Sequence, residues 1–470
     1  MYKPTKHSFI STVVFSVSFG FCSSTFSKNL ENQTLDLSVS SEESQAISPN
    51  RAHYYTLPQA IEYALTHNPD LQIAQQRIGQ AEAQLGEALA SFYPQITARY
   101  SYQYTENPSM VFTHTINQRH LDFNSDFNHP GGVQNFRPEV VANYSLFRGG
   151  QDYQQSKAAE LGVDAATLEQ SAIRNSLTQA VISNYYGYLA AQEAHQVTVS
   201  SIKAVASELE QSRTRYQAGA LLKSDILSLE VQLAEAEDAK IRAENSIELA
   251  KTGLKTLLGL TMNQAFDIAK NSDWQLPQKK PDFDKILEQA IKQRPEIQAA
   301  NKQIEIQERL VNAAEGAHFP RADAYVSYGQ DSRNGSFSSN RDHVTAGVNV
   351  EMDIFSGFAA SERIRKAQRK LAEIQEIKRR IHLNIENEVK TAYLRLQEAL
   401  TRVDITTTAI ASAEEATRMV KDQRQAGTVT VTRYIESEVA RDKAHSLAIA
   451  AQFDALRAEA ELNKARGLWR

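Results

Sequence analysis

The 470-residue sequence has few of the residues that interrupt helices or cross-link a chain. It holds 19 glycines, 12 prolines and one cysteine, Cys22. Scarce glycine and proline favour long helices over a loop-rich fold, and a single cysteine excludes a disulfide framework. No apolar run reaches the roughly 18 residues of a transmembrane helix. The formal net charge of −5, without a basic block, gives no sign of a nucleic-acid partner.

The N-terminal residues have the pattern of a secretory signal. Two lysines precede the apolar run 9–21, and two serines follow it closely. We therefore expect residues 1–24 to be a signal peptide and residues 25–54 to be an N-terminal extension of the exported chain. A buried N-terminal helix is the alternative. Lipidation of Cys22 is a further alternative, although the residues directly before it fit a lipidation signal poorly.

The rest of the chain consists of two similar repeats. Two pairs of anchors are offset by 226 residues, and three later pairs by 208, so the first copy has 18 extra residues between Pro94 and Gly149. Such constant offsets indicate an internal repeat. We expect a first repeat at 55–259, a linker at 260–282 and a second repeat at 283–470. The anchor pairs are Pro69 and Pro295, Pro94 and Pro320, Gly149 and Gly357, Gly219 and Gly427, and Gly259 and Gly467.

Long helices make up most of each repeat. In the first repeat, residues 69–93 have apolar positions at helical spacing, and residues 150–218 contain no proline and three glycines. A helix over the second range is about 100 Å long at 1.5 Å per residue. Residues 220–259 continue with apolar positions three and four apart, a heptad seam. The two shorter helices laid end to end match the long one, as in a barrel of helices. A simple elongated coiled coil is the alternative.

Strand-like alternation separates the helices. We expect strands at about 95–105, 137–147, 321–330 and 343–354, where apolar and polar residues alternate. Their length of about ten residues is that of a tilted membrane-spanning strand. One face carries Tyr, Val and Ala and suits lipid, whereas the other carries charges and suits a wet lumen. An ordinary soluble sheet is the alternative. The charged residues of the polar face are Arg99, Arg321, Asp323, Glu351 and Asp353.

Four strands cannot close into a wide barrel, so several chains must share one. Three chains give twelve strands. The connections 106–136 and 331–342 are polar and are expected to be exposed. The first contains His114, His120 and His129, which could bind a metal but fit surface polar residues better. We expect no metal site and no cofactor.

These features resemble the TolC family of outer-membrane efflux and secretion channels. The resemblance covers about residues 55–470 and rests on the order and duplication of its motifs. It implies a mainly helical homotrimer with a 12-stranded β-barrel in outer-membrane lipid, continuous with a long α-helical barrel in the periplasm. It also implies a periplasmic adaptor and an inner-membrane ABC-type or proton-driven transporter as partners. The motifs are Asn68-Pro69, Phe147-Arg-Gly149-Gly150, Phe355-Ser-Gly357, Tyr216-Gln-Ala-Gly219 and Arg424-Gln-Ala-Gly427.

The resemblance also assigns roles to residues. Gly219 and Gly427 are expected to turn the two helical hairpins at the periplasmic entrance. Relatives narrow this entrance with two rings of aspartate, but the matching positions here carry Arg433 and Glu436. We expect Asp225 to pair with Arg433 across neighbouring hairpins and Glu436 to form an acidic ring; solvated helix-end charges are the alternative. Further expected adaptor contacts are Ala220, Leu221, Thr428 and Val429, and the expected helix-strand transitions are Pro94, Gly149, Pro320 and Gly357.

The leading interpretation is a passive export duct for proteins or small toxic molecules in the outer membrane of a Gram-negative cell. The alternative is a periplasmic coiled-coil scaffold or adaptor without a pore of its own. An enzyme is not expected, because the sequence has neither a His-Glu-x-x-His motif nor a phosphate-binding Gly-rich motif. Type I secretion and multidrug or metal efflux remain open, because the substrate is not readable from the sequence.

Overall fold

The computed structural model describes residues 53–126, 128–269, 275–277 and 282–469. All of them belong to one compact unit, Ala52–Arg470. The expected signal peptide, nearly all of the N-terminal extension, and Cys22 lie outside the described residues.

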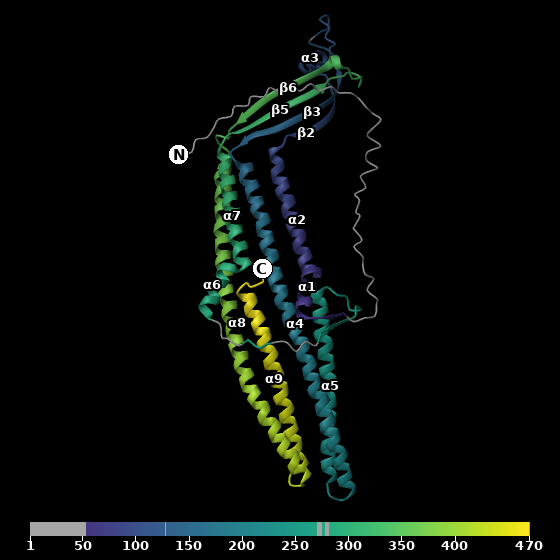
Figure 1. The fold of residues 1–470 in the computed structure, drawn as a ribbon. Helices are drawn as coiled ribbons and strands as arrows, with labels where there is room; N and C mark the ends of the chain where they lie inside the picture. Colours follow the sequence, from purple (N-terminus) through teal and green to yellow (C-terminus); the bar gives the residue numbers. More distant parts are fainter. Residues whose placement is uncertain (1–52, 127, 270–274, 278–281, 470) are drawn as a thin grey trace. The chain divides into compact units, whose positions relative to one another are not determined.

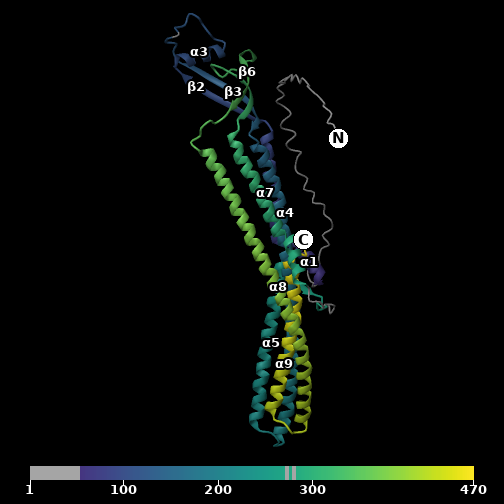
Figure 2. The same cartoon turned by 90° about the vertical axis from the view of Figure 1, so that its left-hand side faces the viewer.

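Nine helices of the described residues carry most of the fold (Figures 1 and 2). Two of them, α4 and α8, have 67 residues each and are therefore about 100 Å long. None of the nine combines the length and apolarity that a bilayer crossing requires. The helices are α1 (Leu57–His67), α2 (Pro69–Leu89), α3 (Pro108–Asn117), α4 (Gln151–Gln217), α5 (Lys223–Leu258), α6 (Phe283–Gln293), α7 (Pro295–Glu315), α8 (Ala359–Gln425) and α9 (Val431–Ala465).

The long helices are lined by pairs of shorter helices laid end to end (Figure 1). Along α4, helices α2 and α5 follow one another on one side, and α7 and α9 follow one another on the other side. Helix α8 packs on the far side of α7 and α9. The layer therefore has two outer edges, one formed by α2 with α5 and the other by α8. The end-to-end stacking expected from the segment lengths is present.

A four-stranded antiparallel sheet lies at one end of these helices (Figure 1). Its order is β2-β3-β5-β6, so β3 and β5 join the two repeats at its centre and β2 and β6 are its edges. A parallel pair of β1 and β4 forms a second, small sheet. The strands are β1 (His53–Tyr55), β2 (Gln95–Thr105), β3 (Val133–Arg148), β4 (Phe266–Ile268), β5 (Arg321–Gln330) and β6 (Asp342–Glu351).

The pairing register separates the two faces of the four-stranded sheet. Ile96 pairs with Ala142, which pairs with Val326. Positions paired directly across strands share a face, so these residues belong to one apolar face. That face is open: Ile96 is 72% exposed and Val348 is 60% exposed. The opposite face carries the ion pairs Arg137–Glu139, Arg148–Asp323 and Arg321–Glu351.

Two expected strand ranges differ from the structure, and two coincide with it. Strands β2 and β5 span the expected 95–105 and 321–330. Strand β3 begins at Val133 rather than 137, because it stays paired with β2 as far as Thr105. Strand β6 ends at Glu351 rather than 354, because its last partner, Arg321, is the first residue of β5. Asp353 therefore lies beyond the strand.

The connection 106–136 is not all loop. Its residues 108–117 form helix α3, which begins with Pro108 in the first turn and is capped by Asn107, whose side chain accepts a bond from the Ser109 N–H at 3.1 Å. Proline in the first turn behind an asparagine cap is a favourable helix start. Asn68 and Pro69 begin α2 in the same way. The polar composition of the connection hid this signal.

Candidate functional site

Both helical hairpins turn through the same glycine-dependent cap. Gly219 has φ +73° and Gly427 has φ +75°, the left-handed region that favours glycine. In each cap the glycine N–H and the following N–H donate to carbonyls of the preceding helix, both at 2.9 Å in the first hairpin and at 3.2 and 3.0 Å in the second. This is the Schellman arrangement, which ends a helix sharply. The structure thus places both predicted turns at these glycines.

The residues beside these glycines differ in exposure. Ala220 and Thr428 are exposed, whereas Leu221 and Val429 are half-buried. Leu221 packs on an apolar cluster that joins α4, α5 and α9, so the two hairpins of one chain contact each other close to their turns. The buried members of the cluster are Val205, Leu209, Ile226, Leu229 and Val431.

The structure brings together two of the three predicted gate residues. The Arg433 guanidinium lies 3.2 Å from the Glu436 carboxylate, one turn away on α9, and both side chains are more than half exposed. Asp225 lies half-buried in the first turn of α5. Within one chain Arg433 therefore pairs with Glu436 rather than with Asp225, because residues three apart on a helix already face each other. A pair between hairpins of different chains stays a prediction.

A buried ion pair near the turns was not predicted. The Arg424 guanidinium of α8 lies 3.0 Å from the Glu208 carboxylate of α4, and the two side chains are 6% and 9% exposed. Arg424 also donates to the Ser212 hydroxyl at 3.3 Å. The Arg215 guanidinium donates to the Arg424 carbonyl oxygen at 3.2 Å. The available signal was a difference between the repeats, since Arg424 occupies the place of Tyr216 in the first copy.

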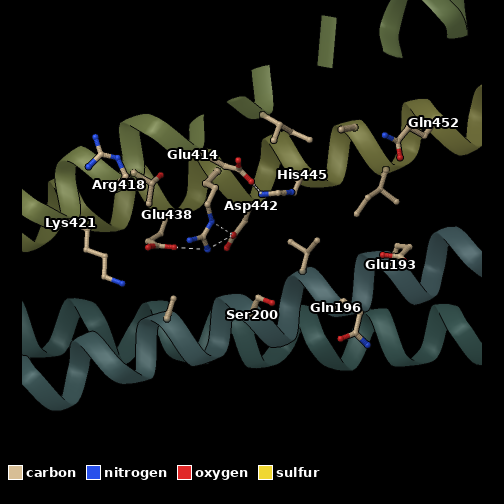
Figure 3. A pocket seen from close by; sticks show the side chains of 17 residues that line it. Glu193, Gln196, Ser200, Glu414, Arg418, Lys421, Glu438, Asp442, His445 and Gln452 are labelled. Carbon is tan, nitrogen blue, oxygen red and sulfur yellow. Dashed lines mark hydrogen bonds and ion pairs between the residues drawn. The ribbon is translucent and has the colours of Figure 1, made fainter. Parts of the chain in front are cut away.

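A groove of about 750 Å³ lies between α4 and the α8–α9 hairpin (Figure 3). Its lining carries charges of both signs. The His445 imidazole lies 3.1 Å from the Glu414 carboxylate, and the Arg441 guanidinium contacts Glu438 at 2.6 Å and Asp442 at 2.9 Å. Such paired charges leave the groove polar.

Glu438 is the most buried acid of this groove. Burial raises the pKa of the Glu438 carboxyl above its ordinary value, and the neighbouring Arg441 guanidinium opposes this only in part. Burial and the Glu438 carboxylate together raise the pKa of the adjacent Tyr434 hydroxyl. The contact between the two hairpins therefore contains an acid that takes up a proton more readily than an exposed glutamate.

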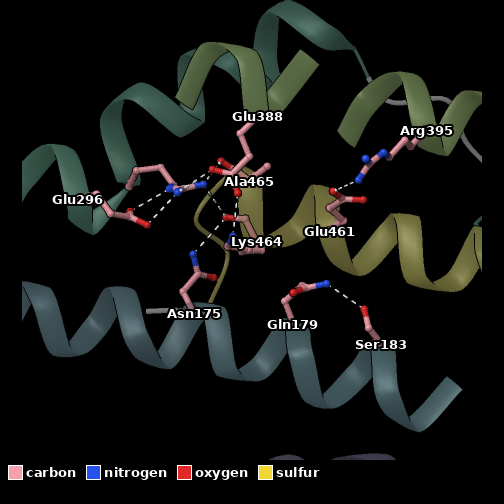
Figure 4. Close-up of polar contacts among 10 residues, drawn as sticks. Asn175, Gln179, Ser183, Glu296, Glu388, Arg395, Glu461, Lys464 and Ala465 are labelled. Carbon is pink, nitrogen blue, oxygen red and sulfur yellow. Dashed lines mark hydrogen bonds and ion pairs between the residues drawn. The ribbon is translucent and has the colours of Figure 1, made fainter. Parts of the chain in front are cut away.

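A second buried polar cluster lies where α9 meets α7 (Figure 4). The Arg294 side chain is 4% exposed and pairs with Glu296 at 2.8 Å and with Glu388 at 3.0 Å. It also donates to the carbonyl oxygens of Lys464 at 3.4 Å and Ala465 at 3.2 Å. These are carbonyls at the end of α9, which have no partner within the helix. Arg294 therefore ties the end of α9 to the start of α7.

In the first repeat a different side chain binds a carbonyl at the end of the corresponding helix. The Asn68 amide donates to the Leu257 carbonyl oxygen at 2.8 Å, where α5 meets α2. Asn68 precedes Pro69 as Arg294 precedes Pro295, and Leu257 corresponds to Ala465 by the offset of 208. In both repeats, therefore, the residue before the proline binds a carbonyl at the end of a neighbouring helix.

Charge balance at the Arg294 cluster also affects Glu388. Burial alone would raise the pKa of the Glu388 carboxyl, but Lys464 at 2.8 Å and Arg294 outweigh it, so the pKa lies below its ordinary value. The carboxylate form is therefore the one that the folded chain favours.

The predicted helix-strand transitions lie between helices and strands. Pro94 and Pro320 directly precede β2 and β5. Gly149 and Gly357, with φ of +62° and +63°, lie between β3 and α4 and between β6 and α8. At Gly149 a side chain would overlap the carbonyl oxygen of Gly316, so this position needs glycine for space as well as for its backbone angle.

One of the three loop histidines is not a surface residue. His114 lies in α3 and is 9% exposed. The prediction of a surface residue was wrong here, because the unpredicted helix packs this side chain inward. His120 and His129 are exposed. Within the described ranges, no three His, Cys, Asp or Glu side chains form a group that could hold a metal ion.

Comparison with known proteins decides the family. The profile of the family described as outer membrane efflux protein matches residues 60–260 and 286–468. The chain belongs to the outer membrane efflux protein family. The match includes both repeats and both hairpins, and it confirms the resemblance drawn from the motifs.

Individual members of the outer membrane efflux protein family and related structures agree with this assignment. Protein CyaE of Bordetella pertussis is 26% identical over 323 residues, 68% of this chain and 64% of CyaE. The cobalt-zinc-cadmium resistance protein CzcC of Cupriavidus metallidurans is 24% identical over 213 residues, 45% of this chain and 49% of CzcC. The chain thus aligns with less than two thirds of either relative. The CmeC outer membrane channel of Campylobacter jejuni superimposes with a TM-score of 0.75 at 17% identity, covering 87% of this chain and 85% of CmeC.

Membership of the outer membrane efflux protein family confirms three predictions. The family is one of transport proteins, the chain is placed in the outer membrane of a Gram-negative cell with a large periplasmic part, and its fold is that of channels related to TolC. The family and the similar structures are channels rather than enzymes. Membership also favours the channel over the periplasmic scaffold.

Proposed function

We propose that the chain is one subunit of a homotrimeric export channel. Three chains form a 12-stranded β-barrel in the outer membrane, continuous with a helical tunnel in the periplasm. The tunnel carries proteins or small toxic molecules from an inner-membrane ABC-type or proton-driven transporter to the outside. Docking of a periplasmic adaptor at the hairpin turns opens it.

The matching edges of the two layers carry this proposal. In the sheet, β2 and β6 are free edges, and β2 follows α2 while β6 leads into α8. In the helical layer, α2 with α5 forms one edge and α8 the other. Unpaired strand edges are not tolerated in lipid. A ring in which β2 and α2 of one chain meet β6 and α8 of the next satisfies both layers with one kind of contact.

The exposed apolar face of the sheet supports a position in lipid. Tyr100 is 62% exposed and Val344 is 67% exposed, which exceeds what a soluble surface normally leaves uncovered across a whole sheet face. Exposed aromatic residues follow at the end near the helices, where Tyr93 is 70% and Phe355 is 74% exposed. Aromatic residues at this level are typical of a membrane interface.

Cross-linking between the edges tests the ring. In a Cys22→Ser background, Tyr100→Cys in β2 and Val348→Cys in β6 are expected to give a ladder that ends at three chains with a bifunctional thiol reagent. The matched control, Val140→Cys with Tyr328→Cys, places the cysteines on paired strands of one chain and is expected to link only within that chain. No link between chains, or a ladder beyond three, would contradict the proposal.

The hairpin turns are the proposed site of adaptor docking and gating. We expect Asp225 of one chain and Arg433 of the next to hold the entrance shut, with Glu436 adding an acidic ring. Arg433→Ala and Asp225→Ala should raise the single-channel open probability, and unchanged gating in both variants would refute the latch. Gly427→Trp should abolish export while leaving trimers in the membrane. Loss of the trimers would instead assign Gly427 a folding role.

A further inference from the structure

A basic cavity of about 440 Å³ lies at the end of the sheet far from the long helices. It is formed by the C-terminal end of α3 and by the connection between β5 and β6. Its volume is in the range of roughly 300–1,000 Å³ that is typical of small-molecule sites. The charged residues of its lining are Arg119, Arg333 and Arg341, joined by His120.

The cavity contains positive charge without a counterion. The other lining residues are serines, asparagines and a glutamine, so no carboxylate lines it. Among the ion pairs of the described residues, none includes Arg119, Arg333 or Arg341. Arg341 instead donates to the Ser336 carbonyl oxygen at 2.8 Å. Three guanidinium groups that line one cavity without an acid repel one another, and an anion between them removes that repulsion.

The walls of the cavity are fixed by buried polar contacts. Gln118 is 1% exposed, and its amide donates to the Gln134 carbonyl oxygen at 2.8 Å and to the Asn135 side chain at 2.9 Å. Phe136 and Ser332 exchange backbone hydrogen bonds at 2.7 and 3.0 Å. Both sides of the cavity are therefore attached to the same strand, β3, and its shape is preorganised.

The carboxyl of Asp331, close to the cavity in the sequence, is engaged by other residues. The Asp331 carboxyl is buried, accepts a hydrogen bond from Asn135 and lies 3.6 Å from the His343 imidazole. It is not part of the cavity lining. The positive charge of the cavity is therefore left for a ligand.

Arg119 is held in a backbone conformation that normally calls for glycine. Its φ is +59°, and its N–H and that of His120 donate to carbonyls of α3 at 2.9 Å each. This is the same cap as at Gly219, with an arginine in the glycine position. A strained residue in a cavity points to a use for its side chain.

We propose that this cavity binds a phosphate group. Arginine donors match the geometry of phosphate oxygens and can bind them in pairs, and the remaining space accommodates the sugar of a phosphorylated glycolipid. The two possible sources are an outer-leaflet glycolipid and a soluble phosphate compound. Only the lipid source rests on the proposed function, which puts this end of the sheet at the outer leaflet.

Binding to the purified full-length chain in detergent tests the site. Isothermal titration calorimetry with inorganic pyrophosphate, and with micelles of bisphosphorylated lipid A, is expected to show binding that weakens as salt is added. Arg119→Gly and Arg333→Gln should each lower the affinity about tenfold to a hundredfold. The control Arg380→Gln removes an exposed arginine of α8 and should change nothing.

The Arg119→Gly variant separates binding from folding. It restores glycine to the cap, so thermal stability should stay equal or rise while affinity falls. Binding of dephosphorylated lipid A as tight as that of the phosphorylated form, or wild-type affinity in both arginine variants, overturns the proposal. Binding of pyrophosphate without binding of lipid A supports the phosphate site with a soluble ligand. Failure of the chain to form a trimer leaves the pyrophosphate result intact, so the two proposals fail separately.

Discussion

The buried pair of Arg424 and Glu208 gives the sharpest test of how the two hairpins are held together. Arg424→Ala leaves the Glu208 carboxylate buried without its guanidinium partner, although the Ser212 hydroxyl still donates to it at 3.0 Å. Breaking a buried ion pair in this way costs about 3–5 kcal/mol. The pair joins α8 to α4 close to both turns, so the loss should fall on the local opening of this region.

Hydrogen exchange measured by mass spectrometry reports that local opening. Since about 1.4 kcal/mol corresponds to a factor of ten, exchange at the C-terminal ends of α4 and α8 should be at least roughly a hundredfold faster in Arg424→Ala. Arg418→Ala is the matched control, because Arg418 pairs with Glu415 on the same helix but is 62% exposed. An exposed pair contributes about 0–1 kcal/mol, so exchange should change by less than roughly tenfold.

A double variant distinguishes the missing pair from lost packing. Glu208→Leu with Arg424→Met replaces both charges by apolar side chains, and such replacements are often nearly neutral. Exchange in the double variant should therefore return most of the way to wild type. If Arg424→Ala behaves like Arg418→Ala, or if the double variant opens as readily as the single one, the pair does not hold the hairpins together.

Three further variants test other parts of the structure, each by thermal unfolding in detergent. In the folded chain the pKa of Glu388 lies below the ordinary value of 4.5, so the Glu388 carboxylate stabilises the fold fully above pH 4.5 and less as the pH falls through the folded pKa. The loss of stability that Glu388→Gln causes at pH 7 should therefore shrink below pH 4.5. In the folded chain the pKa of Glu438 is raised, so its ionised form destabilises the fold at pH 7. Glu438→Gln should therefore be more stable than wild type at pH 7, and this gain in stability should fade as the pH falls toward 4.5. Equal deficits or gains at both pH values would contradict these assignments. Gly149→Ala should unfold far more easily than Gly150→Ala, since both have positive φ but only the first meets a backbone carbonyl; similar losses would show that the close approach does not matter.

Most of the fold could be predicted from local sequence patterns. The alternation after Pro94 and Pro320 predicted the strands, because side chains on the two faces of a sheet meet different surroundings. The alternation continued past Glu351, but a strand ends where its partner's backbone ends. Likewise, the absence of proline predicted the long helices, whereas α3 lay hidden in a polar stretch despite its Asn107-Pro108 start.

The candidate site was predictable only where it depended on local geometry. A left-handed turn needs glycine, so Gly219 and Gly427 could be placed from the sequence alone. Burial of Arg424 depends on Glu208, which is 216 residues away in the chain, and no local pattern encodes that contact. Within the chain Arg433 pairs with Glu436, one turn away on the same helix, and its expected pairing with Asp225 across neighbouring hairpins stays a prediction.

The unlike edges of the subunit have a genetic consequence. In the proposed ring of three, each chain offers β2 with α2 on one side and β6 with α8 on the other, so a single altered chain introduces a defective contact. A cell that makes equal amounts of normal and edge-altered chains would then assemble only roughly one ring in eight entirely from normal chains. Edge variants are therefore expected to be dominant in a mixed population, whereas variants confined to one chain's interior, such as the control cysteines, should be recessive.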